Sequence, residues 1–188
     1  VVDRLERGDI LSHFMTWRPG GMMTPDGKIY PELKEARKRG VILDSSHGKF
    51  NFSFKVAKAM MEEGLFPDII TTDLSLLGFP WVQSLPVTMS KFLNLGMPLP
   101  RVVEAVTGAA AKALGISGEW GSLEPGRAAN ITILNMAEGE YEFFDGAAGN
   151  KLAGRALLEP VMVFRDGVPH PVRSYYHIPA GAASAVPL

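Results

Sequence analysis

The first part of the chain alternates short apolar runs with longer amphipathic segments. Runs of apolar and β-branched residues begin at positions 9, 41 and 68, and a spacing of about 30 residues is typical of strand and helix units in a parallel sheet. We predict helices over 31–39, 53–63, 84–95 and 101–114. Pro31 with early acidic and late basic residues indicates the first helix, and apolar residues at helical spacing indicate the second. Gly40, Gly64 and Gly115 directly follow three of these helices, as C-terminal stops do. This pattern predicts an α/β fold with parallel strands.

The pattern changes near residue 117. Residues 124–127 read as a turn, and 129–134 alternate like a strand. Apolar residues on both sides of Asp166 and Gly167 predict a β-hairpin. We therefore divide the chain into an α/β segment over 1–117 and a small β unit over 118–188. Pro, Ala, Gly and Ser dominate after residue 176, where we expect fraying.

Composition excludes several classes of function. With 21% charged residues and a net charge of -1, the 188-residue chain lacks the basic surface of a nucleic-acid-binding protein. No apolar run reaches the roughly 18 residues of a membrane span, and no signal-peptide pattern opens the chain, so we expect a cytoplasmic protein. Without cysteine, any metal must be held by His, Asp, Glu or a residue of a partner. The chain begins Val-Val-Asp-Arg without Met, which suggests a fragment or a processed end.

Polar side chains end the apolar runs. His13 ends the first run, Asp44 the second and Asp73 the third, and the C-terminal strand ends of an α/β barrel share one rim, where active sites lie. His13 is either a metal ligand or a structural residue. Asp73 is either a functional carboxylate or a helix N-cap, since a charge after an apolar run is costly without a partner. Asp44 either supports a neighbouring ligand or caps a helix.

The other three histidines differ in context. His47 lies in a polar loop after the second run, where it either contacts a substrate or simply faces solvent. His170 lies in the predicted hairpin and His177 in the tail, and we expect neither to be functional. The chain contains no Gly-x-Ser-x-Gly, Walker or Gly-x-Gly-x-x-Gly motif.

Several motifs together resemble the amidohydrolase superfamily, and within it the dihydroorotase-like deacetylase branch. They include Gly-Asp-Ile-Leu-Ser-His at 8–13, Ile-Thr-Thr-Asp-Leu at 70–74, Thr-Gly-Ala-Ala-Ala-Lys-Ala-Leu-Gly at 107–115 and Gly-Ser-Leu-Glu-Pro-Gly-Arg-Ala-Ala at 121–129. The resemblance covers about residues 5–170. It implies the C-terminal part of a metal-dependent TIM-type (β/α) barrel, strands six to eight, followed by a segment of a small β-sandwich.

The resemblance also implies roles for single residues. His13 matches the metal-ligand histidine after the sixth strand, and Asp73 the aspartate after the eighth strand, which binds metal and shuttles a proton. His47 falls in the loop after the seventh strand, where substrate contact is expected. The complete family site holds one or two divalent metals, which we expect to be zinc. Its other ligands precede this chain, Asn130 replaces an aspartate of many relatives, and Ser75 replaces a histidine.

We therefore predict a metal-dependent hydrolase that cleaves an amide or ester of a small molecule, of the deacetylase or N-acyl amidohydrolase type. Three parallel strands are too few to close a barrel, so one edge of the predicted sheet is open. We expect this edge to be covered either by an N-terminal remainder of the barrel or by a second copy of the chain. Two rivals remain. One is a truncated barrel without activity, and the other is a barrel lyase or isomerase that uses His47 as a base without a metal.

Overall fold

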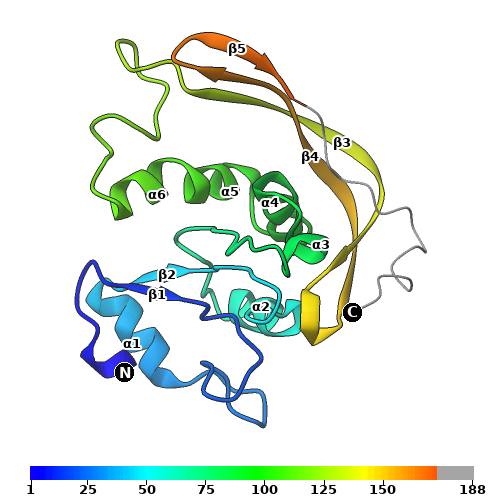
Figure 1. Ribbon diagram of the computed structural model, residues 1–188. Helices are drawn as coiled ribbons and strands as arrows, with labels where there is room; N and C mark the ends of the chain where they lie inside the picture. The colour runs from blue at the N-terminus through cyan, green and yellow to red at the C-terminus, as the bar shows by residue number, and fades with distance from the viewer. Residues whose placement is uncertain (173–188) are drawn as a thin grey trace.

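The computed structural model describes residues 1–172 (Figure 1). Two short 3₁₀ turns, η1 (Val2–Arg4) and η2 (Gly146–Ala148), accompany the helices and strands. The helices are α1 (Pro31–Arg39), α2 (Phe54–Glu62), α3 (Phe79–Val82), α4 (Leu85–Asn94), α5 (Leu99–Val106) and α6 (Gly108–Ala113). The strands are β1 (Ile10–Ser12), β2 (Ile42–Asp44), β3 (Ile131–Phe144), β4 (Lys151–Arg165) and β5 (Val168–Pro171). His177 and the predicted fraying after residue 176 lie outside the described residues.

The three apolar runs lie side by side and in parallel. β1 pairs with β2, with Ser12 opposite Asp44. The third run is extended but joins the sheet by a single parallel bridge between Asp44 and Ile69. Beyond that bridge the His47 N–H donates to the Thr71 carbonyl at 3.0 Å. The predicted parallel arrangement is therefore confirmed, and the C-terminal ends of the three segments point the same way.

Local signals determine the two helices that follow β1 and β2. α1 begins with Pro31 and ends at Gly40, whose φ of 94° only glycine adopts easily. α2 is followed by Gly64 with a φ of 78°. Leu33 of α1 and Met60 of α2 are fully buried. Both helices pack apolar side chains into the interior, as the sequence pattern predicts.

The predicted single helix over 101–114 is wrong. The segment forms α5 and α6, separated at Thr107, whose φ of -126° and ψ of -95° are not helical. Residue 121 lies close to this break, since a Cβ added to Gly121 would be 2.9 Å from the Thr107 carbonyl oxygen and 2.8 Å from the Ala111 Cβ. The chain after α6 thus packs directly on the break between the helices.

The second half forms one antiparallel sheet among the described residues, in the order β3, β4, β5. The turn at Asp166 and Gly167 joins β4 to β5, so the predicted hairpin is confirmed. β3 and β4 are much longer than expected, and they curve around the helices (Figure 1). Two register shifts in this pair accompany the bend. A sandwich needs a second sheet, and residues 118–172 contain only this one.

The long hairpin is attached to the α/β part. The Leu158 N–H donates to Ser90 Oγ of α4 at 2.8 Å, and Asn94 Nδ2 donates to the Ala156 carbonyl at 2.7 Å. Phe143 and Leu157 belong to the same buried cluster as the residues around the parallel sheet. The hydrophobic core is therefore continuous across the predicted boundary near residue 117. No helix in the described chain is long and apolar enough to cross a membrane.

Candidate active site

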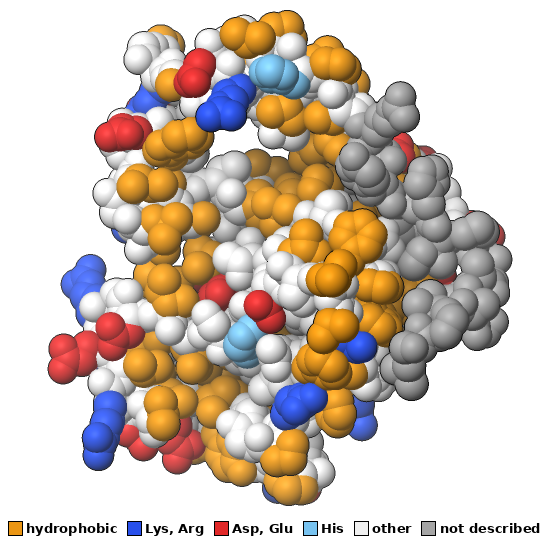
Figure 2. Space-filling view, in the orientation of Figure 1, with side chains coloured by type: hydrophobic (Ala, Val, Ile, Leu, Met, Phe, Trp, Pro, Cys, Tyr) orange, Lys and Arg blue, Asp and Glu red, His pale blue; other side chains and the backbone are white. Residues whose placement is uncertain are grey.

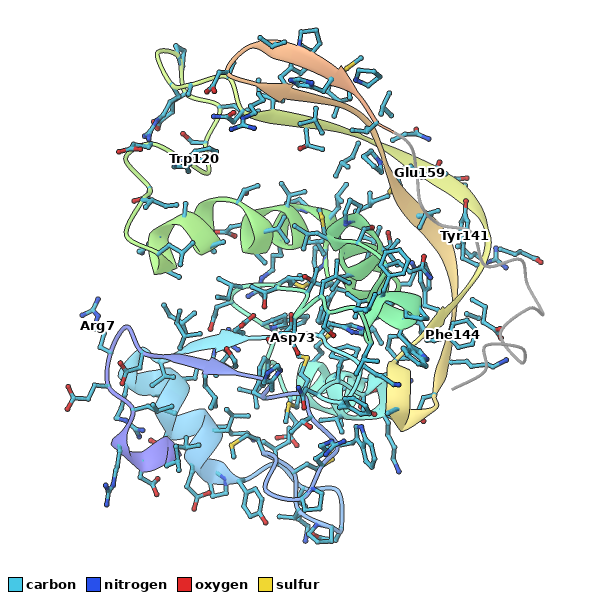
Figure 3. All side chains as sticks on the ribbon, viewed as in Figure 1. Arg7, Asp73, Trp120, Tyr141, Phe144 and Glu159 are labelled. Atoms are coloured by element: carbon cyan, nitrogen blue, oxygen red, sulfur yellow. The ribbon has the colours of Figure 1, made fainter. Side chains whose placement is uncertain are left out.

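The C-terminal ends of the three parallel segments turn sharply at one edge of the sheet. His13, Ser46 and Asp73 have positive φ angles of 60°, 37° and 44°. Such backbone is uncommon outside glycine, and strained residues concentrate at functional sites. Figure 3 shows Asp73 at this edge, beside the ends of β1 and β2. Each turn places polar groups at the edge instead of continuing the strand.

His13 is fixed by the loop that follows β2. Its Nδ1 lies 2.7 Å from the Ser46 carbonyl oxygen. Because a carbonyl oxygen only accepts, Nδ1 carries the proton, and Nε2 of the neutral ring keeps its lone pair. A hydrogen bond from the opposite ring nitrogen is also what orients histidines that bind metals. The half-buried His13 ring is thus in the tautomer that can bind a cation through Nε2.

Asp73 lies against the same loop. A Cβ on Gly48 would stand 2.6 Å from Asp73 Oδ2, so the absence of a side chain at position 48 makes room for this carboxylate. The Gly48 N–H donates to the Thr72 carbonyl at 3.0 Å, which holds the loop beside the end of the third segment. The next helix, α3, has Gly78 as its N-cap. The interpretation of Asp73 as a helix N-cap is therefore wrong.

Asp44 connects all three segments beneath this edge. Its buried carboxylate accepts hydrogen bonds from the Ser12 hydroxyl at 2.9 Å, the Thr71 hydroxyl at 2.8 Å and the Ser46 N–H at 3.1 Å. These donors belong to β1, the third segment and the loop after β2. The arrangement favours the supporting role over the helix cap, because it fixes the loop that contacts His13 and Asp73.

His47 does not face solvent, so that alternative is wrong. Its side chain is fully buried and stacks on Phe52 with ring centroids 4.2 Å apart. Nδ1 lies 3.0 Å from the Gly48 carbonyl oxygen and Nε2 lies 3.0 Å from Lys91 Nζ. Burial, and then the charge of Lys91, hold the pKa of His47 well below its usual value. The expected substrate contact stays a prediction.

Lys91 is a site residue that the sequence analysis missed. It lies on α4, is 1% exposed, and donates from Nζ to the Trp81 carbonyl at 2.6 Å and the Phe144 carbonyl at 2.9 Å. Burial lowers its pKa to about 7, against the attraction of Asp145. The sequence contained an indication of this role, because Lys91 is the single charged residue in the helix 85–94. A charge in an otherwise apolar and neutral helix is costly to bury without partners.

Ionisable side chains also gather on one face of the molecular surface. Figure 2 shows a histidine next to acidic side chains near the middle of one face, with hydrophobic side chains around them. His170 is exposed on β5. Within residues 1–172 no group of three His, Asp or Glu side chains is placed to hold a metal ion. His13 and Asp73 border the loop at residues 46–48, and the Asp44 carboxylate supports that loop through the Ser46 N–H.

Comparisons with known proteins place this geometry in context. A family model described as the amidohydrolase family matches residues 12–168. A deacetylase of Brucella anthropi is 36% identical over 162 residues, which are 85% of this chain and 40% of the relative. A deacetylase of Agrobacterium fabrum is 34% identical over 85% of this chain and 39% of its own length.

Solved structures show the same similarity. An adenine deaminase superposes with a TM-score of 0.87 at 26% identity, covering 91% of this chain and 47% of the deaminase. A dihydroorotase superposes with a TM-score of 0.82 at 29% identity, covering 93% of this chain and 45% of the dihydroorotase. The chain thus spans less than half the length of each of these proteins.

Proposed function

Because the chain belongs to the amidohydrolase family, we propose that it supplies part of the active site of a metal-dependent hydrolase that cleaves an amide or ester bond of a small molecule. The observation that carries this proposal is the shared loop at residues 46–48, which orients His13 through Ser46 and makes room for Asp73 at Gly48. Two relatives named deacetylases support an acyl compound as the substrate.

The donor set fits a divalent cation. His13 offers a neutral imidazole nitrogen and Asp73 a carboxylate, a combination that suits zinc and similar ions. A divalent cation polarises a carbonyl oxygen and lowers the pKa of water. Since catalytic zinc sites have three protein ligands, the complete site requires at least one ligand from outside the described residues. We assign these ligands, and the remaining barrel strands, to an N-terminal part of the protein.

The chain's own contribution to the reaction is a proton transfer. An Asp73 carboxylate oxygen accepts a proton from the attacking water as the oxygen of that water bonds to the scissile carbonyl carbon. The same oxygen then gives the proton to the leaving nitrogen or oxygen as its bond to carbon breaks. Asp73 is exposed at the edge of the sheet, where a substrate can reach it. Asp44 keeps the loop beside it in place.

The test is Asp73→Asn in the complete protein, with hydrolysis of N-acetyl and O-acetyl compounds and bound metal as the measurements. We expect normal folding but a loss of turnover of about 10²–10⁴-fold, because an amide cannot accept the proton. Weaker metal binding adds to the loss. Asp3→Asn, the same change at an exposed position on η1, is the control. Wild-type turnover by the Asp73→Asn protein would falsify the proposal.

A further inference from the structure

Lys91 connects three parts of the chain that meet behind the candidate site. Its Nζ reaches the Trp81 carbonyl at the end of α3, the Phe144 carbonyl at the end of β3, and Nε2 of His47 in the loop after β2. We propose that Lys91 is a positioning residue, which fixes the His47 ring and, through Gly48, the place of the Asp73 carboxylate. The effect on turnover rests on the proposed function, whereas the effect on the ring does not.

The hydrogen bonds of the His47 ring determine which atom carries its proton. Nδ1 faces the Gly48 carbonyl oxygen at 3.0 Å, and a carbonyl only accepts, so Nδ1 is protonated. Nε2 therefore presents a lone pair and needs a donor. Lys91 supplies that donor, and the three hydrogens of its ammonium match three acceptors. An apolar residue at position 91 would leave all three acceptors without this donor.

The step from His47 to Asp73 passes through the backbone. The His47 ring accepts from Lys91 on one side and bonds to the Gly48 carbonyl on the other, so the ring limits the orientation of the Gly48 peptide. The N–H groups of His47 and Gly48 donate to Thr71 and Thr72, the two residues before Asp73. Because Asp73 Oδ2 lies where a Gly48 side chain would be, a shift of this loop displaces the carboxylate.

Burial lowers the pKa of Lys91 to about 7, so its side chain is an ammonium group below that pH. Asp145, in the turn between β3 and β4, attracts it, although the Asp145 carboxylate itself accepts from the N–H groups of Phe54 and Asn150. His47 is kept neutral by burial and by Lys91. Without Lys91, burial alone would oppose protonation of His47.

The experiment uses Lys91→Met in the complete protein, with Lys58→Met, the same change at an exposed position on α2, as the control. Nitrogen NMR of the His47 ring is recorded across pH, and kcat and KM are measured over the same range. In the wild type we expect an Nδ1-protonated ring that does not titrate between about pH 5 and 8. In Lys91→Met we expect the pKa of the ring to rise above its wild-type value, because the charge of Lys91 is gone, and to stay below the ordinary value of about 6.5, because the ring is still buried.

For turnover, we expect kcat of Lys91→Met to fall about tenfold to a hundredfold with little change in KM, as misplaced catalytic groups produce. Its pH profile should gain an acidic limb at the pKa that NMR reports for His47. A purely structural role would lower the amount of folded protein and leave kcat per folded molecule and the profile unchanged, which would overturn the proposal.

The remaining outcomes are also decisive. If Lys91→Met does not fold, the wild-type spectra test the proposal. An Nε2-protonated or titrating His47 ring would contradict the assigned hydrogen bonds to Gly48 and Lys91 and overturn it. If the wild type binds no metal and hydrolyses no acyl compound, the proposed function fails. In that case the His47 spectra of the wild type and the variant still test whether Lys91 fixes the ring.

Discussion

Single residues at the C-terminal strand ends determine what this edge of the sheet can bind. Ser46 contributes a carbonyl that fixes the tautomer of His13, and Gly48 contributes the space that Asp73 occupies. Neither residue is itself a proposed ligand. The chemistry of the site thus depends on a backbone oxygen and a missing side chain as much as on the two ionisable groups.

Replacing Gly48 with Ala tests the importance of that space. Gly48 has a φ of +48° and its added Cβ would meet Asp73 Oδ2, whereas Gly64 has a φ of +78° with nothing within 4 Å. Each Ala variant should lose about 1–2 kcal/mol of stability from the left-handed backbone. Only Gly48→Ala should also lose turnover in the complete protein, by about tenfold to a hundredfold.

Urea unfolding and steady-state kinetics measure the two effects. Equal kinetics of Gly48→Ala and Gly64→Ala would show that Asp73 does not depend on the space beside Gly48.

At the scale of elements, the break between α5 and α6 lies where a later part of the chain packs against the helices. Residues 107–113 are rich in alanine, and the helix nevertheless breaks at Thr107. The Thr107 hydroxyl bonds back to the Val103 carbonyl at 2.7 Å, and the backbone at Gly121 lies against the break. This packing holds the segment between α6 and β3 against the helices.

A pair of glycines with nearly equal backbone angles tests this packing. Gly121 has a φ of +87° and Gly126 a φ of +92°, but an added Cβ meets Ala111, Thr107 and Gly108 only at position 121. Gly121→Ala should therefore lower the free energy of unfolding by about 1–3 kcal/mol more than Gly126→Ala, because the backbone must shift. Equal losses in denaturant unfolding would mean that the contact with the α5 and α6 break adds no stability.

At the scale of the whole molecule, the α/β part and the long hairpin form one hydrophobic core around an open parallel sheet. The described chain provides three parallel segments, whereas a closed (β/α) barrel needs eight strands. The open sheet edges carry unpaired backbone groups that favour pairing with further strands. The hairpin covers the helices and does not close this sheet (Figure 1).

We therefore predict that the isolated 188-residue chain does not catalyse the proposed reaction. With two of the donors of a metal site, it should neither retain zinc stoichiometrically nor hydrolyse N-acetyl or O-acetyl compounds when zinc is added. Addition of the proposed N-terminal barrel strands should confer both properties. Zinc-dependent turnover by the isolated chain at about 1 s⁻¹ or more, in the range of ordinary enzymes, would show that its own residues complete the site.

The sequence alone predicted the features that depend on neighbouring residues. Pro31 and Gly40 determine the two ends of α1, and Asp166 with Gly167 determines the last hairpin, because capping and turn geometry are local. The apolar runs that end in His13 and Asp73 also predicted the parallel segments and the edge at which both residues lie. The assignment of these two residues as metal ligands stays a prediction.

Only the tertiary structure decided the features that depend on residues far apart in the chain. The polar loop around His47 left solvent exposure as one of two alternatives, yet Phe52 and Lys91 lie against its buried ring. β3 and β4 extend well beyond their alternating segments: β4 packs on α4 and β3 pairs with β4. The break between α5 and α6 at Thr107 lies against Gly121. Periodicity and capping report the preferences of adjacent residues, whereas burial and hydrogen bonding between distant segments exist only once the chain has folded.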